Sequence, residues 1–192
     1  MSSRNNILAS IKKAKPAGIN IEVPQVNAVV YEDPISRFKE VLAGIGGHCF
    51  EVKSYEAINR FIHDNWSTKR IISNVAELNS LPQLDHSVHA HQLENIEIAV
   101  LQAQFAVAEN GAVWLTGQEM GIRVLPFISQ QLAVVVNRAA VLSNMQQAYE
   151  TIGNDHYAFA AFIAGPSKTA DIEQSLVLGA HGPAEMAVFV MW

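Results

Sequence analysis

Residues 165–183 read GPSKTADIEQSLVLGAHGP and gather turn-forming residues, hydroxyl groups and charges around one short apolar run. The run SLVLG at 175–179 is typical of a buried strand, and the steps Gly165-Pro166 and Gly182-Pro183 mark sharp turns on either side of it. In open α/β sheets, ligands bind at strand ends. We therefore expect polar chemistry at both ends of a buried strand here.

The rest of the chain alternates between helical and extended patterns. Apolar residues at helical spacing predict helices over 34–45, 55–66 and 143–152, while apolar runs predict strands over 48–52, 69–73, 87–89, 96–102, 112–116, 132–137, 159–164 and 186–191. Parallel strands need a covering helix between them, so this alternation predicts an α/β fold with a mixed, mainly parallel sheet. Some of the strands in the middle of the chain should be antiparallel.

The chain has the length of one domain, preceded by a separate helix. Its 192 residues favour a single α/β domain, which we place at 25–192. Residues 1–24 are predicted to form an N-terminal helix, with Ile7, Leu8 and Ile11 on one face, followed by an extended connector. This helix could pack on a neighbouring molecule rather than on its own domain, and a homo-oligomer is one way to provide that neighbour.

Composition and charge exclude several functions. Thirteen Lys and Arg against eighteen Asp and Glu give a net charge of -5 without a basic cluster, so we expect no nucleic-acid partner. The single cysteine, Cys49, cannot form an internal disulfide or by itself hold an iron–sulfur cluster, and it suits a reducing cytoplasm. The apolar runs are too short to span a membrane, and the N-terminus has no convincing signal or transit sequence.

The first candidate site is the group Ser167, Lys168 and Thr169, which follows the turn at Gly165-Pro166. If these residues begin a helical turn, free backbone amides, one cation and two hydroxyls would attract a small anion. The alternative is plain capping, with Thr169 as the N-cap and Asp171 as a favourable acid in the first turn.

His181 is the best candidate for proton transfer. Its unperturbed pKa lies near neutrality, Asp171 is the natural acid to orient it, and the flanking Gly182 would let a ligand approach closely. A lone histidine at a strand end is also often structural. The two interpretations both stay open on the sequence alone.

A second candidate site is formed by Glu109, Asn110 and Gly111, with Arg123 further along the chain. Glu109 and Asn110 could face a cleft, but Asn-Gly before a strand is also a common hairpin turn. Arg123 could clamp a carboxylate or phosphate, or it could be an ordinary surface residue.

A metal site is not expected. Three histidines, His86, His89 and His91, lie close in sequence, but on an extended strand His86 would face away from the other two. No HExxH or CxxC motif occurs, and the glycine pairs complete neither a dinucleotide fingerprint nor a P-loop.

The chain resembles the lactate-utilisation protein C family, also called the LUD domain or YkgG-like family. The C-terminal pattern of that family is similar to GPSrTaDIe followed by a GvHGP-type segment, and residues 165–183 match it nearly in full. The resemblance extends less specifically through Leu125-Pro126 and residues 108–115, and only weakly to the helix from Arg4 to Ile11.

Two departures accompany this resemblance. The chain has Asn110-Gly111-Ala112 where members of the family usually have Thr-Gly-Thr or Thr-Gly-Ser, and Lys168 where arginine is common. The loss of two hydroxyls means that a ligand contact at the first of these loops cannot simply be copied from the family.

The resemblance implies a three-layer α/β fold shared with sugar-phosphate isomerases, CoA transferases and the formyltetrahydrofolate cyclo-ligase. It also implies an accessory role in the oxidation of L-lactate to pyruvate, beside partner proteins that carry the iron–sulfur clusters. This chain would itself hold no cofactor and would bind a small anionic metabolite. The alternative is a stand-alone isomerase- or transferase-like enzyme acting on a small phosphorylated or carboxylated metabolite. Kinship of fold does not decide between the two.

Overall fold

The structure is a computed structural model that describes residues 3–16, 27–169 and 177–192. The N-terminal part is mainly helical: α1 (Ser3–Ala14), α2 (Pro34–Gly44), β1 (His48–Val52), α3 (Tyr55–Trp66) and β2 (Ile71–Ser73). The middle contains β3 (Ile98–Gln102), β4 (Phe105–Val107), β5 (Ala112–Thr116), α4 (Gly117–Met120), α5 (Leu125–Ile128), β6 (Gln131–Asn137), β7 (Val141–Leu142) and α6 (Met145–Ile152). The last elements are β8 (Ala160–Ala164), β9 (Lys168–Thr169), β10 (Val177–Leu178) and β11 (Glu185–Met191).

The centre of the fold is a five-stranded sheet in the order β1-β11-β6-β3-β2. All of its neighbouring strands run parallel, which confirms the predicted mixed α/β fold with a mainly parallel sheet. The last strand, β11, lies between β1 and β6, with Phe189 paired to Phe50 on one side and to Val135 on the other. The C-terminal strand is therefore part of the core, and Val188 to Val190 are fully buried.

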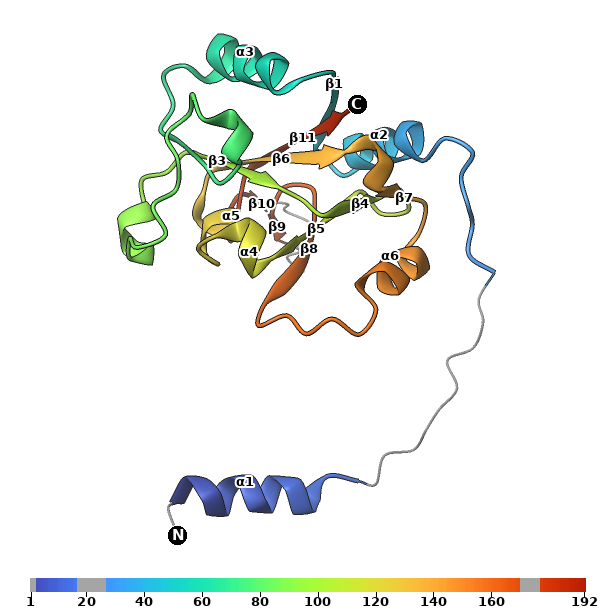
Figure 1. The fold of residues 1–192 in the computed structure, drawn as a ribbon, viewed down its shortest axis with the longest axis vertical. Coiled ribbons are helices and arrows are strands. Elements are labelled where there is room, and N and C mark those ends of the chain that lie inside the picture. The colour runs from blue at the N-terminus through green and yellow to red at the C-terminus, as the bar shows by residue number, and fades with distance from the viewer. Residues whose placement is uncertain (1–2, 17–26, 170–176) are drawn as a thin grey trace.

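A second, four-stranded sheet in the order β7-β4-β5-β8 packs against one face of the central sheet. The predicted antiparallel pairing occurs here, because β5 runs antiparallel to both β4 and β8. Figure 1 shows the resulting layers: α3 covers one face of the central sheet, the second sheet lies on the other side, and α6 lies beyond the second sheet.

The helices begin where the sequence places capping residues. The Asp33 carboxylate accepts hydrogen bonds from the backbone amides of Ile35 and Ser36 at the start of α2. The Ser54 hydroxyl accepts a hydrogen bond from the amide of Ala57 in the first turn of α3. Local hydrogen bonding to the first free amides fixes both helix starts.

Several sequence expectations are wrong in detail. Residues 87–89 form no strand; they lie in a turn region before a 3-10 helix at Ala90–Leu93. The N-cap of α6 is Asn144 rather than Ser143, because the Asn144 side chain accepts from the amide of Gln147. Strand β4 was not expected, since its three apolar residues carry no alternation that would distinguish them from the flanking chain.

Candidate functional site

The two ends of the stretch 165–183 meet in space. We call residues 165–169, which follow β8, the first arm, and residues 179–184, which precede β11, the second arm. The Ser167 amide donates to the Pro183 carbonyl at 2.7 Å, and the Gly179 amide donates to the Ser167 carbonyl at 3.0 Å. A Cβ placed on Gly182 would lie only 3.2 Å from Ser167 Cβ, so the absence of a side chain there permits the close approach of the arms.

The local structure of β9 and β10 differs from the prediction. Lys168 and Thr169 form the short strand β9, and the Thr169 hydroxyl both donates to the Val177 carbonyl and accepts from the Val177 amide. Val177 and Leu178 pair only with β9 and are 53% and 54% exposed, so the expected buried strand is wrong within the described residues. The helical turn expected after Thr169, and with it the predicted anion site at the start of that turn, lies outside the described residues.

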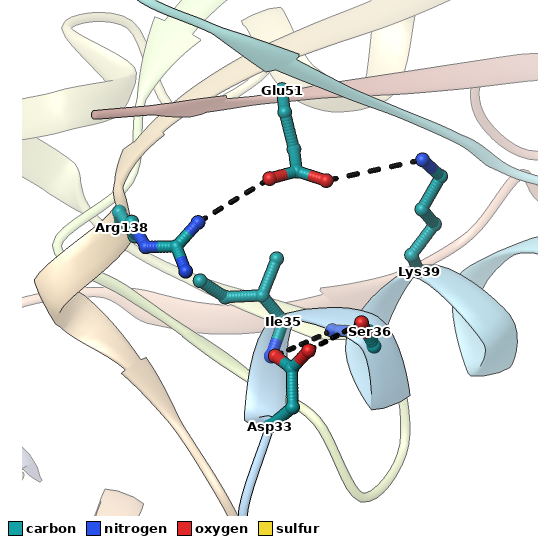
Figure 2. Close-up of polar contacts among 6 residues, drawn as sticks. All are labelled: Asp33, Ile35, Ser36, Lys39, Glu51 and Arg138. Carbon is teal, nitrogen blue, oxygen red and sulfur yellow. Dashed lines mark hydrogen bonds and ion pairs between the residues drawn. The ribbon is translucent and has the colours of Figure 1, made fainter.

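The second arm lies at the amino edge of the central sheet, because it leads into the start of β11. The carboxyl edge, where open sheets usually bind ligands, carries structural contacts instead. Figure 2 shows the Glu51 carboxylate between Arg138, at 3.3 Å, and Lys39, at 4.0 Å. The Arg138 guanidinium carbon also lies 3.5 Å from the ring centroid of Trp192. These contacts tie the ends of three strands and α2 together.

Two glycines from different parts of the sequence pack against the end of α2. Gly165 has φ +70°, and a Cβ there would lie 3.2 Å from the Ile45 carbonyl oxygen. Gly111 has φ +71°, and a Cβ there would lie 3.3 Å from the Leu42 backbone. A left-handed backbone conformation and a close approach to backbone both favour glycine. The β4–β5 turn and the first arm are thus brought to one helix end.

Lys168 joins this region through its side chain. A Cβ placed on Gly46, just after α2, would lie 3.9 Å from Lys168 Cε and 3.5 Å from Pro166 Cγ. The aliphatic part of the Lys168 side chain therefore lies over the turn between α2 and β1, while the residue as a whole is exposed. A cation near a helix C-terminus is favoured by the helix dipole.

Glu109 and Asn110 have local partners in the structure. The Glu109 carboxylate accepts from the Met145 amide at 2.8 Å, at the start of α6. Asn110 Oδ1 accepts from the Ala112 amide at 3.0 Å, within the β4–β5 turn. These bonds support the interpretation of the segment as a turn and helix cap. Gly111 alone of these three residues is shown packing on the end of α2, where Gly165 of the first arm also packs.

An open hollow of about 400 Å³ lies beside the second arm. One wall is formed by Phe127–Gln130, at the end of α5 and in the link to β6, and the other by Gly179–Gly182 with Ala184. The Ala184 amide donates to the Gln130 carbonyl at 2.7 Å and holds the two walls together. His181 is exposed on the second wall. The hollow offers an imidazole, backbone groups and one aromatic ring to a small ligand.

The first wall of this hollow is not predicted by the sequence pattern. Its only signal was the Leu125-Pro126 step, which begins α5 and turns the chain toward β6. Ser129 is 1% exposed there, and its hydroxyl has no hydrogen-bond partner among the described residues. Arg123 lies behind the same wall: its guanidinium carbon is 5.6 Å from the Phe159 ring, which packs edge-on against Phe127 at 6.4 Å.

Not every predicted site residue can be placed. Asp171 lies outside the described residues, so the proposed pairing of Asp171 with His181 stays a prediction. Ser167, Lys168, His181 and Gly182 belong to the two joined arms. Their roles in binding or catalysis also stay predictions, because geometry alone assigns no ligand.

The next feature is the arrangement of the side chains that could bind a metal ion. They include no group of three or more His, Cys, Asp or Glu side chains arranged to hold a metal ion. His89 and His91 stack with their ring centroids 5.2 Å apart, and His89 Nδ1 accepts from the His91 amide. Burial raises the pKa of the Cys49 thiol to about 11, so the thiol is protonated at neutral pH. Among the described helices, none combines the length and apolarity needed to cross a membrane.

Comparison with known proteins gives consistent relatives. A lactate utilization protein C of Bacillus pumilus (strain SAFR-032) is 32% identical over 117 residues, which cover 55% of this chain and 48% of the relative. The protein of the same name from Geobacillus thermodenitrificans (strain NG80-2) is 29% identical over 140 residues, or 70% of this chain and 56% of the relative. The chain thus spans about half the length of these two relatives. A third, from Geobacillus sp. (strain WCH70), is 23% identical and matches over 98% of this chain and 79% of its own length.

A solved structure supports the fold. The crystal structure of a DUF162 family protein from Deinococcus radiodurans superposes with a TM-score of 0.58 at 15% identity, covering 83% of this chain and 96% of that protein. The pattern of the LUD domain matches residues 35–191, which include every strand of both main sheets. The chain therefore belongs to the LUD domain family.

Proposed function

We propose that this chain acts in L-lactate utilisation as an accessory protein that binds a small anionic metabolite between its two joined arms. Membership of the LUD domain family and the names of the relatives support the pathway. The observation that carries the ligand site is the pair of backbone hydrogen bonds that joins the arms at Ser167 beside an open hollow. In this proposal, Lys168 supplies a positive charge and His181 a hydrogen-bonding imidazole to the anion.

The electron balance supports the accessory role. Conversion of lactate to pyruvate removes two electrons and two protons, and something must accept the electrons. Within these 192 residues the single cysteine is half-buried and its pKa is raised to about 11, so the residues present do not fit an iron–sulfur cluster. We place the clusters in partner proteins of a lactate-oxidising complex, and the complex in the cytoplasm.

Thermal unfolding in the presence of L-lactate, pyruvate or phosphate tests the ligand. A ligand present at a hundred times its dissociation constant should stabilise the chain by about 2.7 kcal/mol. Lys168→Gln should reduce this stabilisation, while Lys53→Gln, at an exposed lysine near the opposite edge of the central sheet, should not. Equal stabilisation of both variants would place the anion elsewhere.

Co-purification tests the accessory role. The tagged chain, expressed in its own cells and isolated under gentle conditions, should bring with it proteins that show the visible absorption of iron–sulfur clusters. If no such partners are recovered, the accessory role is refuted. Turnover of a metabolite by the isolated chain would favour the alternative of a stand-alone isomerase or transferase.

A further inference from the structure

One buried hydroxyl in the hollow beside the second arm has no partner. Ser129 lies between α5 and β6, lines this hollow and is 1% exposed. Its hydroxyl makes no hydrogen bond with any of the described residues. Because Ser129 borders the hollow and is nevertheless shielded from bulk water, it belongs to the floor of the hollow rather than to its rim. Nearly all buried polar groups in proteins are hydrogen-bonded, so an unpaired one requires an explanation.

The other buried serines of the described chain have partners within the fold. Ser143 is 5% exposed, and its hydroxyl accepts a hydrogen bond from the Tyr31 amide at 3.1 Å. Ser73 is fully buried, and its hydroxyl accepts from the Val75 amide at 3.1 Å. Ser129 is therefore the one buried serine, among the residues that the structure describes, whose hydroxyl is not used by the fold.

The floor of the hollow carries no charge. Of the residues that line the hollow, only His181 can become charged, and it is exposed. Lys168, on the adjoining first arm, is exposed as well. Glu185, just after the second arm, accepts from Gln131 Nε2 at 2.7 Å and lines a different hollow, beside α3. The positive charge that a bound anion needs is therefore available at the exposed rim and not at Ser129.

This distribution of charge favours one chemical class of ligand. A carboxylate buried at the floor would lack a cation, and burial of an unpaired charge is costly. A neutral oxygen suits the floor, because a serine hydroxyl can both donate to it and accept from it. A short carboxylic acid with a hydroxyl or keto oxygen on the carbon next to the carboxylate has both groups, a charged one for the rim and a neutral one for the floor.

We propose that Ser129 is a specificity-determining residue that selects 2-hydroxy and 2-oxo acids. Its hydroxyl binds the hydroxyl or keto oxygen of the acid, while the carboxylate lies nearer to His181. This inference rests on the proposed function and adds a substrate class to the same anion site. A site built around such a hydrogen bond rejects an analogue that lacks the oxygen, because the buried hydroxyl then stays unpaired.

Calorimetric titration of the full chain with L-lactate, pyruvate and propionate tests the selection. Propionate has the same carbon chain and carboxylate but no oxygen on the neighbouring carbon. The wild type should bind lactate or pyruvate at least about fivefold more tightly than propionate. Ser129→Ala should remove this difference by weakening the binding of the oxygenated acid and not that of propionate. The matched control is Ser143→Ala, which also removes a buried hydroxyl and should keep the preference.

Urea unfolding separates a role in binding from a role in the fold. Loss of an unpaired hydroxyl should leave the unfolding midpoint of Ser129→Ala equal to that of the wild type or higher. Ser143→Ala should lower the midpoint, because it leaves the Tyr31 amide without its acceptor. A lowered midpoint in Ser129→Ala would show that the fold uses the hydroxyl, and the inference would be wrong.

The titrations also distinguish failure of this inference from failure of the proposed function. If the acids bind but the wild type does not prefer an oxygenated acid, or if Ser129→Ala keeps the preference, the inference is overturned and the anion site stands. If the wild type binds phosphate and none of the three acids, the substrate class is overturned while an anion site remains. If it binds no anion at all, both are overturned.

Discussion

Substitution of Gly165 by alanine should destabilise the fold through a contact that the structure defines. Gly165 has φ +70°, and an added Cβ would lie 3.0 Å from Ile45 Cγ1 and 3.2 Å from the Ile45 carbonyl oxygen. The left-handed conformation costs a non-glycine residue about 1–2 kcal/mol. The crowding against backbone adds about 1–3 kcal/mol, as is usual for overpacking. We expect Gly165→Ala to lower the free energy of unfolding by about 2–5 kcal/mol.

Gly153→Ala separates the two contributions. Gly153 also has a positive φ, +56°, but an added Cβ there would meet only the Glu150 carbonyl oxygen at 3.7 Å, an ordinary contact. Its ψ of -131° lies outside the left-handed helical region, in a conformation that side chains rarely adopt, so we expect a conformational cost of about 1–3 kcal/mol without a packing contribution. Gly44→Ala, in α2 with no atom within 4 Å of the added Cβ, should stabilise the chain by about 0.5–1 kcal/mol.

Urea unfolding followed by circular dichroism measures all three variants. The predicted order of stability is Gly44→Ala, wild type, Gly153→Ala and then Gly165→Ala. If Gly165→Ala is no less stable than Gly153→Ala, the first arm does not pack on the end of α2 as described, and the assembly of the candidate site there fails.

Three further predictions concern the core, pH and the thiol. Phe189→Ala should cost about 3–5 kcal/mol in urea unfolding, because this fully buried ring packs 5.5 Å from Phe50 and 5.2 Å from Phe61; a loss under 1 kcal/mol would contradict the packing. Burial raises the pKa of Glu119, but hydrogen bonds from Thr116 and Gln104 outweigh burial and leave the pKa lowered. The Glu119 carboxylate therefore stabilises the fold above its unfolded pKa of about 4.3, and this stabilisation is lost as the pH falls through the lower folded pKa. Glu119→Gln should accordingly reduce the acid sensitivity of unfolding, and an unchanged pH profile would refute the assignment. Cys49, with its pKa raised to about 11, should react with Ellman's reagent at pH 8 far more slowly in the folded chain than in urea; equal rates would show an accessible thiolate.

Much of the central sheet could be predicted because its signals are local. Asp33 and Ser54 cap the starts of α2 and α3, because their side chains accept hydrogen bonds from nearby backbone amides, and Gly153 ends α6 with a positive φ. The apolar runs that become β1 and β11 are long enough to be recognised as strands. These features depend on residues within a few positions of one another.

The candidate site depended on contacts that no local pattern contains. The run at 175–179 is apolar enough for a buried strand, yet Val177 and Leu178 are exposed and pair antiparallel with β9, because β11 rather than this run enters the central sheet. The meeting of Gly111 and Gly165 at the end of α2 joins residues more than fifty positions apart. The residue pattern located the stretch 165–183 and the resemblance to a family supported it, but only the topology shows what surrounds it.

We propose that the two joined arms form one site for a small anion. Isothermal titration calorimetry of the full chain with L-lactate and with pyruvate measures this binding, using Lys168→Gln, His181→Asn and the control Lys53→Gln. We expect measurable binding of at least one anion by the wild type and the control, and a dissociation constant raised at least about tenfold, or 1.4 kcal/mol, in each arm variant. If neither anion binds, or if all four proteins bind with equal affinity, the arms do not form this site.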